Sequence, residues 1–351
     1  MHSASFIAIL SILIVAKNGV GFYSHGHTFE SAASLPDPHD YTSVGIIGPI
    51  IYRIFNLNNW SWTLFTACIL GISFILPIFA AKRAYPKKEV WKVVAIVMAC
   101  WPALSSTMQL LGHYQAVMLL SVTAALVSRN KIIILFWLVV AGLSLPEQAA
   151  FGFIALLIAS YSELLRPFRR RAQLGLVIAA TWLLISSIWL MVNDVPSRGV
   201  VLVEGVLEGV KGFLAGGALG IYSWWGPLWV LVLIMALQAK GKGRWAMLVG
   251  AVIIPAGATI STTDGTRVFA SVAAPLAVGL VLSYFSIDPS ISRKRIPRPS
   301  QFEQSALPAC QGELTLGMWM VAFLLLPSVV SQFGSEAYRA PWAEFINLLI
   351  R

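Results

Sequence analysis

Residues 60–80 read WSWTLFTACILGISFILPIFA, a run of 21 residues without a charge. A helix of about 20 apolar residues is long enough to cross the hydrocarbon core of a bilayer. The run is followed by a basic stretch that contains Lys82, Arg83, Lys87 and Lys88. Lysine and arginine are enriched on the cytoplasmic side of membrane proteins. The segment therefore predicts a transmembrane helix whose C-terminal end lies in the cytoplasm.

Similar apolar runs recur along the whole chain, separated by short polar breaks. With 58% apolar residues, 11% charged residues and a mean hydropathy of +0.77, the composition differs from that of soluble domains. The runs lack the alternation of strands, so they predict an all-α, polytopic membrane protein with a single transmembrane domain over residues 1–351. About eleven transmembrane helices are predicted, near residues 3–20, 60–80, 91–111, 114–127, 131–146, 149–163, 173–192, 222–238, 245–260, 267–286 and 314–333.

The basic residues predict the orientation of these helices. If the N-terminus is cytoplasmic, 18 of the 25 lysines and arginines fall in inner breaks. An odd number of spans then places the C-terminus outside. The net charge is +10, but the basic residues mark one side of the predicted membrane, so we expect no nucleic acid partner.

Three of the predicted loops are long. In the first outer loop, residues 21–59, the segment Val44–Leu57 has apolar residues at helical spacing, which predicts a helix lying in the outer interface. The fourth outer loop, residues 193–221, predicts a second helix of this kind. The inner loop 287–313 is rich in arginine and lysine, which predicts contact with anionic membrane lipids.

The first outer loop also carries the densest group of ionisable residues on the predicted outer face. Asp37, His39 and Asp40 lie within four positions in a chain where charge is scarce. Such a group suits two chemistries, and the sequence leaves both open. A carboxylate can act as general base toward a hydroxyl, with Asp40 as first choice and Asp37 as second. Alternatively, the three side chains can hold Mg²⁺ or Mn²⁺.

Other polar groups are predicted to reach the same face at the ends of later spans. Those expected to bind substrate are His113, Glu147, Gln148, Tyr222, Trp224, Trp225, Asp264 and Arg267. Ionisable groups at membrane depth usually face a cavity or a partner, so we expect these groups to converge on a wet cavity. Simpler interpretations remain open, because the aromatic residues suit an interfacial belt and Asp264 can pair with Arg267 alone.

This layout resembles the GT-C superfamily of integral-membrane glycosyltransferases. The resemblance covers the topology from about Phe6 to Leu237 and rests on the first-loop acids Asp37 and Asp40, the interfacial helix after them and the enlarged fourth outer loop. It implies a polyprenyl-phosphate sugar donor, with a first-loop aspartate as base or metal ligand. It further implies that Arg267 holds the lipid phosphate, that His113 or Glu147 orients a substrate, and that Trp224 and Trp225 stack on sugar.

The sequence therefore predicts an enzyme that transfers a sugar to a lipid or glycan acceptor, with inversion, on the outer face of a bacterial inner membrane. The short C-terminal segment from Gly334 and the lack of an Asp-x-Asp motif depart from larger family members. Two other functions remain open. A transporter or lipid flippase would have broken helices and polar groups near span centres. A non-catalytic assembly subunit would have its polar groups scattered.

Overall fold

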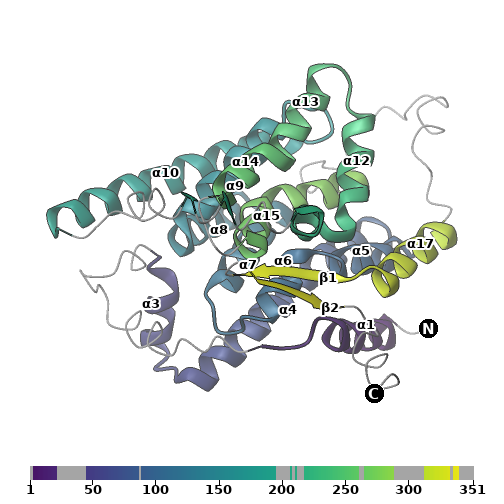
Figure 1. The fold of residues 1–351 in the computed structure, drawn as a ribbon, viewed down its shortest axis with the longest axis horizontal. Coiled ribbons are helices and arrows are strands. Elements are labelled where there is room, and N and C mark those ends of the chain that lie inside the picture. The colour runs from purple at the N-terminus through teal and green to yellow at the C-terminus, as the bar shows by residue number, and fades with distance from the viewer. Residues whose placement is uncertain are drawn as a thin grey trace.

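The computed structural model describes residues 3–21, 45–86, 88–194, 206–207, 210–211, 217–260, 265–287, 312–332 and 335–339, and these residues are predominantly helical (Figure 1). The α-helices are α1 Ser3–Asn18, α3 Ile47–Ile54, α4 Asn59–Ala84, α5 Val90–Ala99, α6 Pro102–Met108, α7 Gln115–Val127, α8 Lys131–Ser144, α9 Pro146–Ala159, α10 Arg169–Val192, α12 Trp229–Gln238, α13 Lys242–Leu248, α14 Ile254–Ile260, α15 Gly265–Tyr284 and α17 Gly312–Leu325. The turns Arg166–Phe168 and Gly226–Leu228 are 3₁₀-helical, and Val249–Ile253 is a π-helical turn between α13 and α14.

Each of the eleven predicted spans contains a helix, but the helices differ in length and the last span also contains a strand. In the part of the chain that the structure describes, four helical segments are long and apolar enough to cross a membrane: Asn59–Ala84, Arg166–Val192, Gly217–Gln238 and Gly265–Tyr284. The pair α5 and α6, bent by 53°, makes a fifth if it is one span. The protein is thus a helical chain compatible with a membrane, while eleven crossings and their direction stay predictions.

Local side-chain chemistry explains several helix boundaries. Before α4, the Asn58 side chain accepts from the Ser61 N–H and the Ser61 hydroxyl accepts from the Asn58 N–H, each at 2.8 Å. This reciprocal capping box satisfies two amides that the first turn leaves without helical partners. The Asn130 side chain caps α8 by accepting from the Ile132 N–H at 2.9 Å, and Pro146 occupies the first turn of α9.

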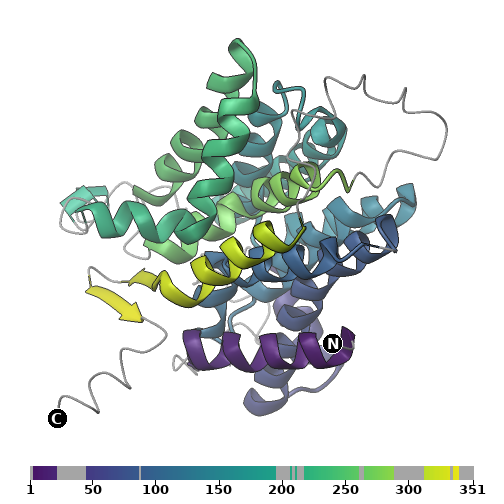
Figure 2. The same cartoon turned by 90° about the vertical axis from the view of Figure 1, so that its right-hand side faces the viewer.

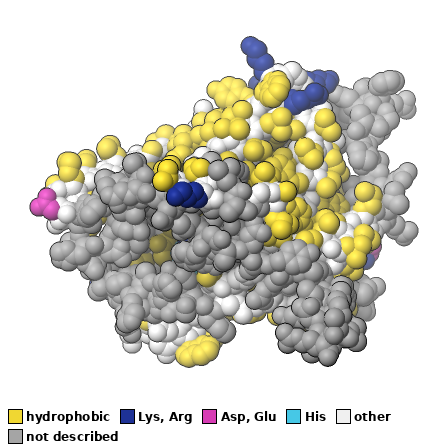
Figure 3. Space-filling view, in the orientation of Figure 1, with side chains coloured by type: hydrophobic (Ala, Val, Ile, Leu, Met, Phe, Trp, Pro, Cys, Tyr) yellow, Lys and Arg dark blue, Asp and Glu magenta, His cyan; other side chains and the backbone are white. Residues whose placement is uncertain are grey.

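Turns that the sequence assigns to the inner side contact one another. The Arg171 guanidinium donates to the carbonyls of Leu126 and Ser128, the latter at 3.1 Å, so it completes the C-terminal end of α7. The Ser283 hydroxyl donates to the Leu164 carbonyl at 2.8 Å. The turn between α12 and α13 is another predicted inner break. Its exposed lysine and arginine side chains are visible at the top of Figure 3. The alternation of inner and outer ends stays a prediction.

The centre of the molecule is formed by α7 and α15, which are almost completely buried. Helix α9 packs on α15, and α17 packs on α5. Figure 2 shows that α17 leads into the C-terminal hairpin. By contrast, α10 projects from the body and exposes Val177, Leu184 and Met191, as lipid-facing residues would be (Figure 1). The buried helices therefore form a protein core with apolar helices around it.

The end of the last predicted span is a correction. The sequence predicts a helix over residues 314–333, but α17 ends at Leu325 and the strands β1 Ser328–Gln332 and β2 Ser335–Arg339 form an antiparallel hairpin. Pro327 has no N–H to continue the helix, and the β-branched pair Val329-Val330 favours a strand. The predicted all-α class is therefore wrong for this hairpin. The strand β1 packs against α6 and α15.

The predicted interfacial helix of the first outer loop appears as the shorter helix α3. Its N-terminal residues Gly48 and Pro49 are buried, while Ile54 and Phe55 are 72% and 65% exposed. An exposed apolar end is what an interfacial helix would present to lipid. The predicted second interfacial helix falls in 193–221, where residues 195–205, 208–209 and 212–216 lie outside the described residues.

The packing of α9 on α15 depends on Gly152. A Cβ at this position would lie 2.7 Å from the Val272 carbonyl oxygen and 2.9 Å from the Pro275 ring. We expect Gly152→Ala to lower the free energy of unfolding by about 1–3 kcal/mol, because the two backbones must separate. Unfolding in detergent micelles, followed by tryptophan fluorescence, measures this.

Gly71→Ala in α4 is the matched control, since a Cβ there meets nothing within 4 Å. It should leave the protein unchanged or stabilise it by up to about 1 kcal/mol through helix propensity. Equal destabilisation by both substitutions would contradict the close approach of α9 and α15.

Candidate functional site

The candidate site is built around the turn between α6 and α7, residues 109–114. The Trp62 Nε1–H donates to the Gly112 carbonyl at 2.6 Å, and the Gly112 N–H donates to the Thr66 hydroxyl at 3.0 Å. Gly112 has a φ of 102°, a conformation that favours glycine. Two bonds from α4 therefore fix the turn, which positions His113.

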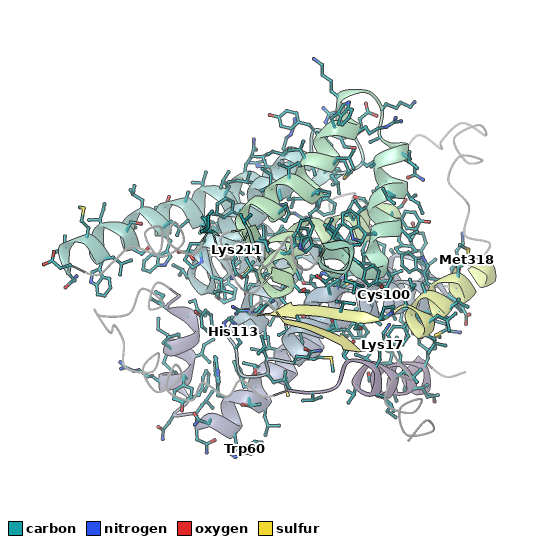
Figure 4. All side chains as sticks on the ribbon, in the orientation of Figure 1. Lys17, Trp60, Cys100, His113, Lys211 and Met318 are labelled. Atoms are coloured by element: carbon teal, nitrogen blue, oxygen red, sulfur yellow. The ribbon has the colours of Figure 1, made fainter. Side chains whose placement is uncertain are left out.

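His113 and Arg267 form the central contact of the site. The Arg267 Nη1 lies 2.7 Å from the His113 Nε2, although the two residues are 154 positions apart. The imidazole is 6% exposed and stacks on the Tyr114 ring at 4.5 Å. Figure 4 places His113 in the interior, away from the exposed Trp60 at the start of α4. The structure thus brings together two residues that the sequence assigns to one site.

Two hydrogen-bond donors approach the nitrogens of the imidazole. The Gln115 N–H donates to the His113 Nδ1 at 3.1 Å, while the guanidinium, which has donors only, approaches the Nε2. A neutral imidazole has one acceptor nitrogen, so it can satisfy only one of these two groups. An anionic oxygen beside the pair would accept from the guanidinium and, in the Nε2–H tautomer, from the imidazole. The pair therefore suits a phosphate or a carboxylate.

Arg267 lies in the first turn of α15, where helix amides and the helix dipole also favour an anion. The Thr266 hydroxyl donates to the Ser223 hydroxyl, which donates to the Gly220 carbonyl, each at 2.7 Å. The start of α15 is thereby tied to the helical segment Gly217–Gln238. Asp264, the predicted neighbour of Arg267, lies outside the described residues.

Glu147 and Gln148 start α9 at the same end of the molecule. A Cβ on Gly45 would lie 2.4 Å from the Ser144 carbonyl and 3.3 Å from the Tyr114 ring, so the α8–α9 turn adjoins the 109–114 turn. Gln148 is buried, and its Oε1 has no hydrogen-bond partner. These two predicted residues therefore lie on the side of the molecule that carries His113.

The aromatic group at 222–225 reaches the same region but belongs to the interior packing. Trp224 and Trp225 are 5% and 1% exposed, and Trp224 stacks on Phe269 at 4.6 Å. The Trp225 Nε1–H donates to the Ala251 carbonyl at 2.9 Å, and the Tyr222 hydroxyl donates to the Pro327 carbonyl at 3.0 Å. Sugar stacking by these rings stays a prediction.

The first-loop residues Asp37, His39 and Asp40 lie outside the described residues, which stop at Gly21 and resume at Gly45. Both of these glycines are fixed beside the 109–114 turn. Gly21 forms backbone hydrogen bonds with Met108 and Leu111, each at 3.0 Å, and a Cβ on Gly45 would lie 3.3 Å from the Tyr114 ring. The segment with the predicted catalytic acids is thus flanked on both sides by residues close to the 109–114 turn.

Among the described residues, no three histidine, cysteine, aspartate or glutamate side chains meet in a group that could hold a metal ion. The predicted ligands of Mg²⁺ or Mn²⁺ are all in the first loop, so metal binding stays a prediction.

The sequence interpretation missed Gln115, whose side chain is fully buried beside the site with both amide atoms unpartnered. A single glutamine at the start of an apolar helix gives no signal of this kind, because exposure depends on the neighbouring helices.

The fold and site define a helical protein with several apolar helices and a part-buried arginine–histidine pair at one end. Comparison with protein-family models, with curated proteins and with solved structures gives no match. The resemblance to GT-C glycosyltransferases therefore rests on the sequence layout.

Proposed function

We propose that this protein is a membrane-embedded, GT-C-like glycosyltransferase that takes a sugar from a polyprenyl-phosphate donor. The observation that carries the proposal is the contact between Arg267 and His113, beside the two fixed ends of the acidic first loop. The donor-rich pair suits the phosphate of the donor lipid, and an arginine fork binds phosphate oxygens by two hydrogen bonds.

In the proposed reaction, an acceptor hydroxyl attacks the anomeric carbon of the donor sugar. The bond between this carbon and the phosphate oxygen breaks, and the polyprenyl phosphate leaves with the bonding electron pair. The hydroxyl proton passes to a first-loop carboxylate, for which Asp40 is the first choice and Asp37 the second. Arg267 and His113 stabilise the negative charge of the leaving phosphate.

The acceptor is proposed to be a lipid or glycan on the outer face of a bacterial inner membrane. Exposed apolar side chains on α3, α4 and α10 support a membrane location, and these helices would surround the buried core. Mg²⁺ or Mn²⁺ held by Asp37, His39 and Asp40 would clamp the phosphate, and activity measured with and without EDTA tests this role.

A transporter or lipid flippase is the second candidate, and one observation favours it. The 53° break between α5 and α6 at Trp101-Pro102, with the π-helical turn Val249–Ile253, resembles the interrupted helices of transporters. The two functions differ in whether a covalent bond breaks.

The test uses membrane vesicles that contain the protein and polyprenyl-phosphate donors labelled on glucose, galactose, mannose or N-acetylglucosamine. We expect the label of one donor to move to a second lipid or glycan, with release of polyprenyl phosphate. Vesicles without the protein serve as the control. Movement of an intact donor between leaflets, with no label transferred, would instead establish the flippase.

A further inference from the structure

Two buried amide side chains at the site have groups without hydrogen-bond partners. Gln115 is 0% exposed, and neither its Nε2 nor its Oε1 is hydrogen-bonded. Gln148 is 6% exposed, and its Oε1 is likewise unbonded. Buried polar groups in folded proteins are almost always paired, because leaving them unpaired costs free energy. Two such amides in one region indicate a place where a polar ligand completes the pairing.

Gln115 lies beside the pair formed by His113 and Arg267. Its backbone N–H donates to the His113 Nδ1 at 3.1 Å, and the Arg267 Nη1 contacts the Nε2 of the same ring. Its helix α7 packs against α15, which carries Arg267.

The position of Gln148 along the axis of α15 follows from the packing of α9 on α15. Gly152 lies against Val272 and Pro275, and Leu156 lies against Gly279, so the two helices run in the same direction. One helical turn before Gly152 is Gln148, and about one turn before Val272 is the first part of α15, with Arg267. Gln148 therefore lies at about the same height along α15 as Arg267.

We propose that Gln115 and Gln148 bind the hydroxyl groups of the donor sugar, next to the phosphate held by Arg267. The proposal rests on the proposed function and assigns the part of the site that selects the sugar. An amide has one acceptor oxygen and two N–H donors, and a sugar hydroxyl both donates and accepts. Because an amide is neutral, it suits an uncharged polyhydroxyl ring better than a cation. A site built on such bonds rejects ligands that lack the hydroxyl.

The test compares the unfolding temperature of the full chain in detergent micelles with two probes. Farnesyl phosphate tests the phosphate site alone. Farnesyl phosphate esterified with glucose, galactose, mannose or N-acetylglucosamine tests the sugar contacts in addition. In the wild-type protein, we expect one sugar compound to raise the unfolding temperature further than farnesyl phosphate does.

Gln115→Met replaces the amide by an apolar side chain of similar length. This variant should keep the shift caused by farnesyl phosphate and lose the additional shift caused by the sugar. Without any probe, it should unfold at the same temperature as the wild type or about 2 °C higher, because an unpaired buried amide has been removed. Gln148→Met is the second variant, should Gln115→Met fail to fold. Gln238→Met, at an exposed glutamine, is the matched control and should change neither shift.

The failures are distinguishable. If the sugar adds the same shift to wild-type and Gln115→Met protein, or adds none to the wild type while farnesyl phosphate binds, the assignment of the amides is overturned and the donor lipid site stands. If neither probe shifts the wild type, the proposed function fails, and the sugar contacts with it.

Discussion

The double substitution Asp37→Asn and Asp40→Asn should abolish sugar transfer while the protein remains expressed and folded. Asparagine keeps the size of aspartate but cannot take a proton or supply a charged metal ligand. General-base catalysis contributes about 10²–10⁴-fold to rate, so Asp40→Asn alone should lower kcat by at least about 10². Asp37→Asn should have a smaller effect, since Asp37 is the second choice for the base. Transfer of labelled sugar from the lipid donor measures both variants.

The matched control is Asp194→Asn at the end of α10. Asp194 is exposed, is predicted to lie on the same outer side and has a φ of 55°, which asparagine adopts readily. Its substitution should leave transfer unchanged. Full activity in the Asp37/Asp40 double variant, at normal expression, would exclude the first loop from catalysis and refute the proposed mechanism.

Arg267→Gln should lower kcat/KM for the lipid donor by about 10- to 100-fold. Hydrogen bonds to charged groups contribute about 1.5–3 kcal/mol, and each 1.4 kcal/mol corresponds to a factor of ten. KM should rise because the donor phosphate is bound before reaction, and kcat should fall because charge grows on the leaving phosphate. Arg267→Lys should restore only part of the loss, since lysine lacks the two-pronged geometry of the guanidinium.

Lys211→Gln is the control for loss of a positive charge, since Lys211 is an exposed residue of the long loop 193–221 (Figure 4). It should leave kcat/KM unchanged. A purely structural role for Arg267 predicts a different result. In that case Arg267→Gln and His113→Gln would lower the unfolding temperature together, with no change in KM, and a double-mutant cycle would show their coupling in stability alone.

Helix positions followed from local chemistry that the sequence displays. The predicted spans 131–146 and 149–163 coincide with α8 and α9, which begin after the cap Asn130 and at Pro146. The last predicted span was wrong beyond Leu325, because an apolar run such as the one around Val329 does not itself distinguish helix from strand. In the structure, the strand β1 that replaces this end of the helix packs against α6 and α15.

Convergence at the site was only partly predictable. The sequence could place His113 and Arg267 on one side of the predicted membrane, because lysine and arginine counts order the turns. It could not show that the two side chains touch, since they are 154 residues apart and their contact depends on how α7 packs against α15. The aromatic residues show the limit most clearly. Trp224 looked like an interfacial ring in the sequence, yet it stacks on Phe269 inside the protein.

By itself, the sequence determined that the chain is a set of apolar helices and where most of them begin and end. Runs such as residues 60–80 do this because backbone groups in an apolar segment are satisfied within one helix, without reference to distant residues. Only the tertiary structure decided which helices form the core, that Arg267 meets His113, and that Gln115 is buried with its amide unpaired. These features depend on side chains from separate helices occupying the same space, and a linear sequence does not specify that.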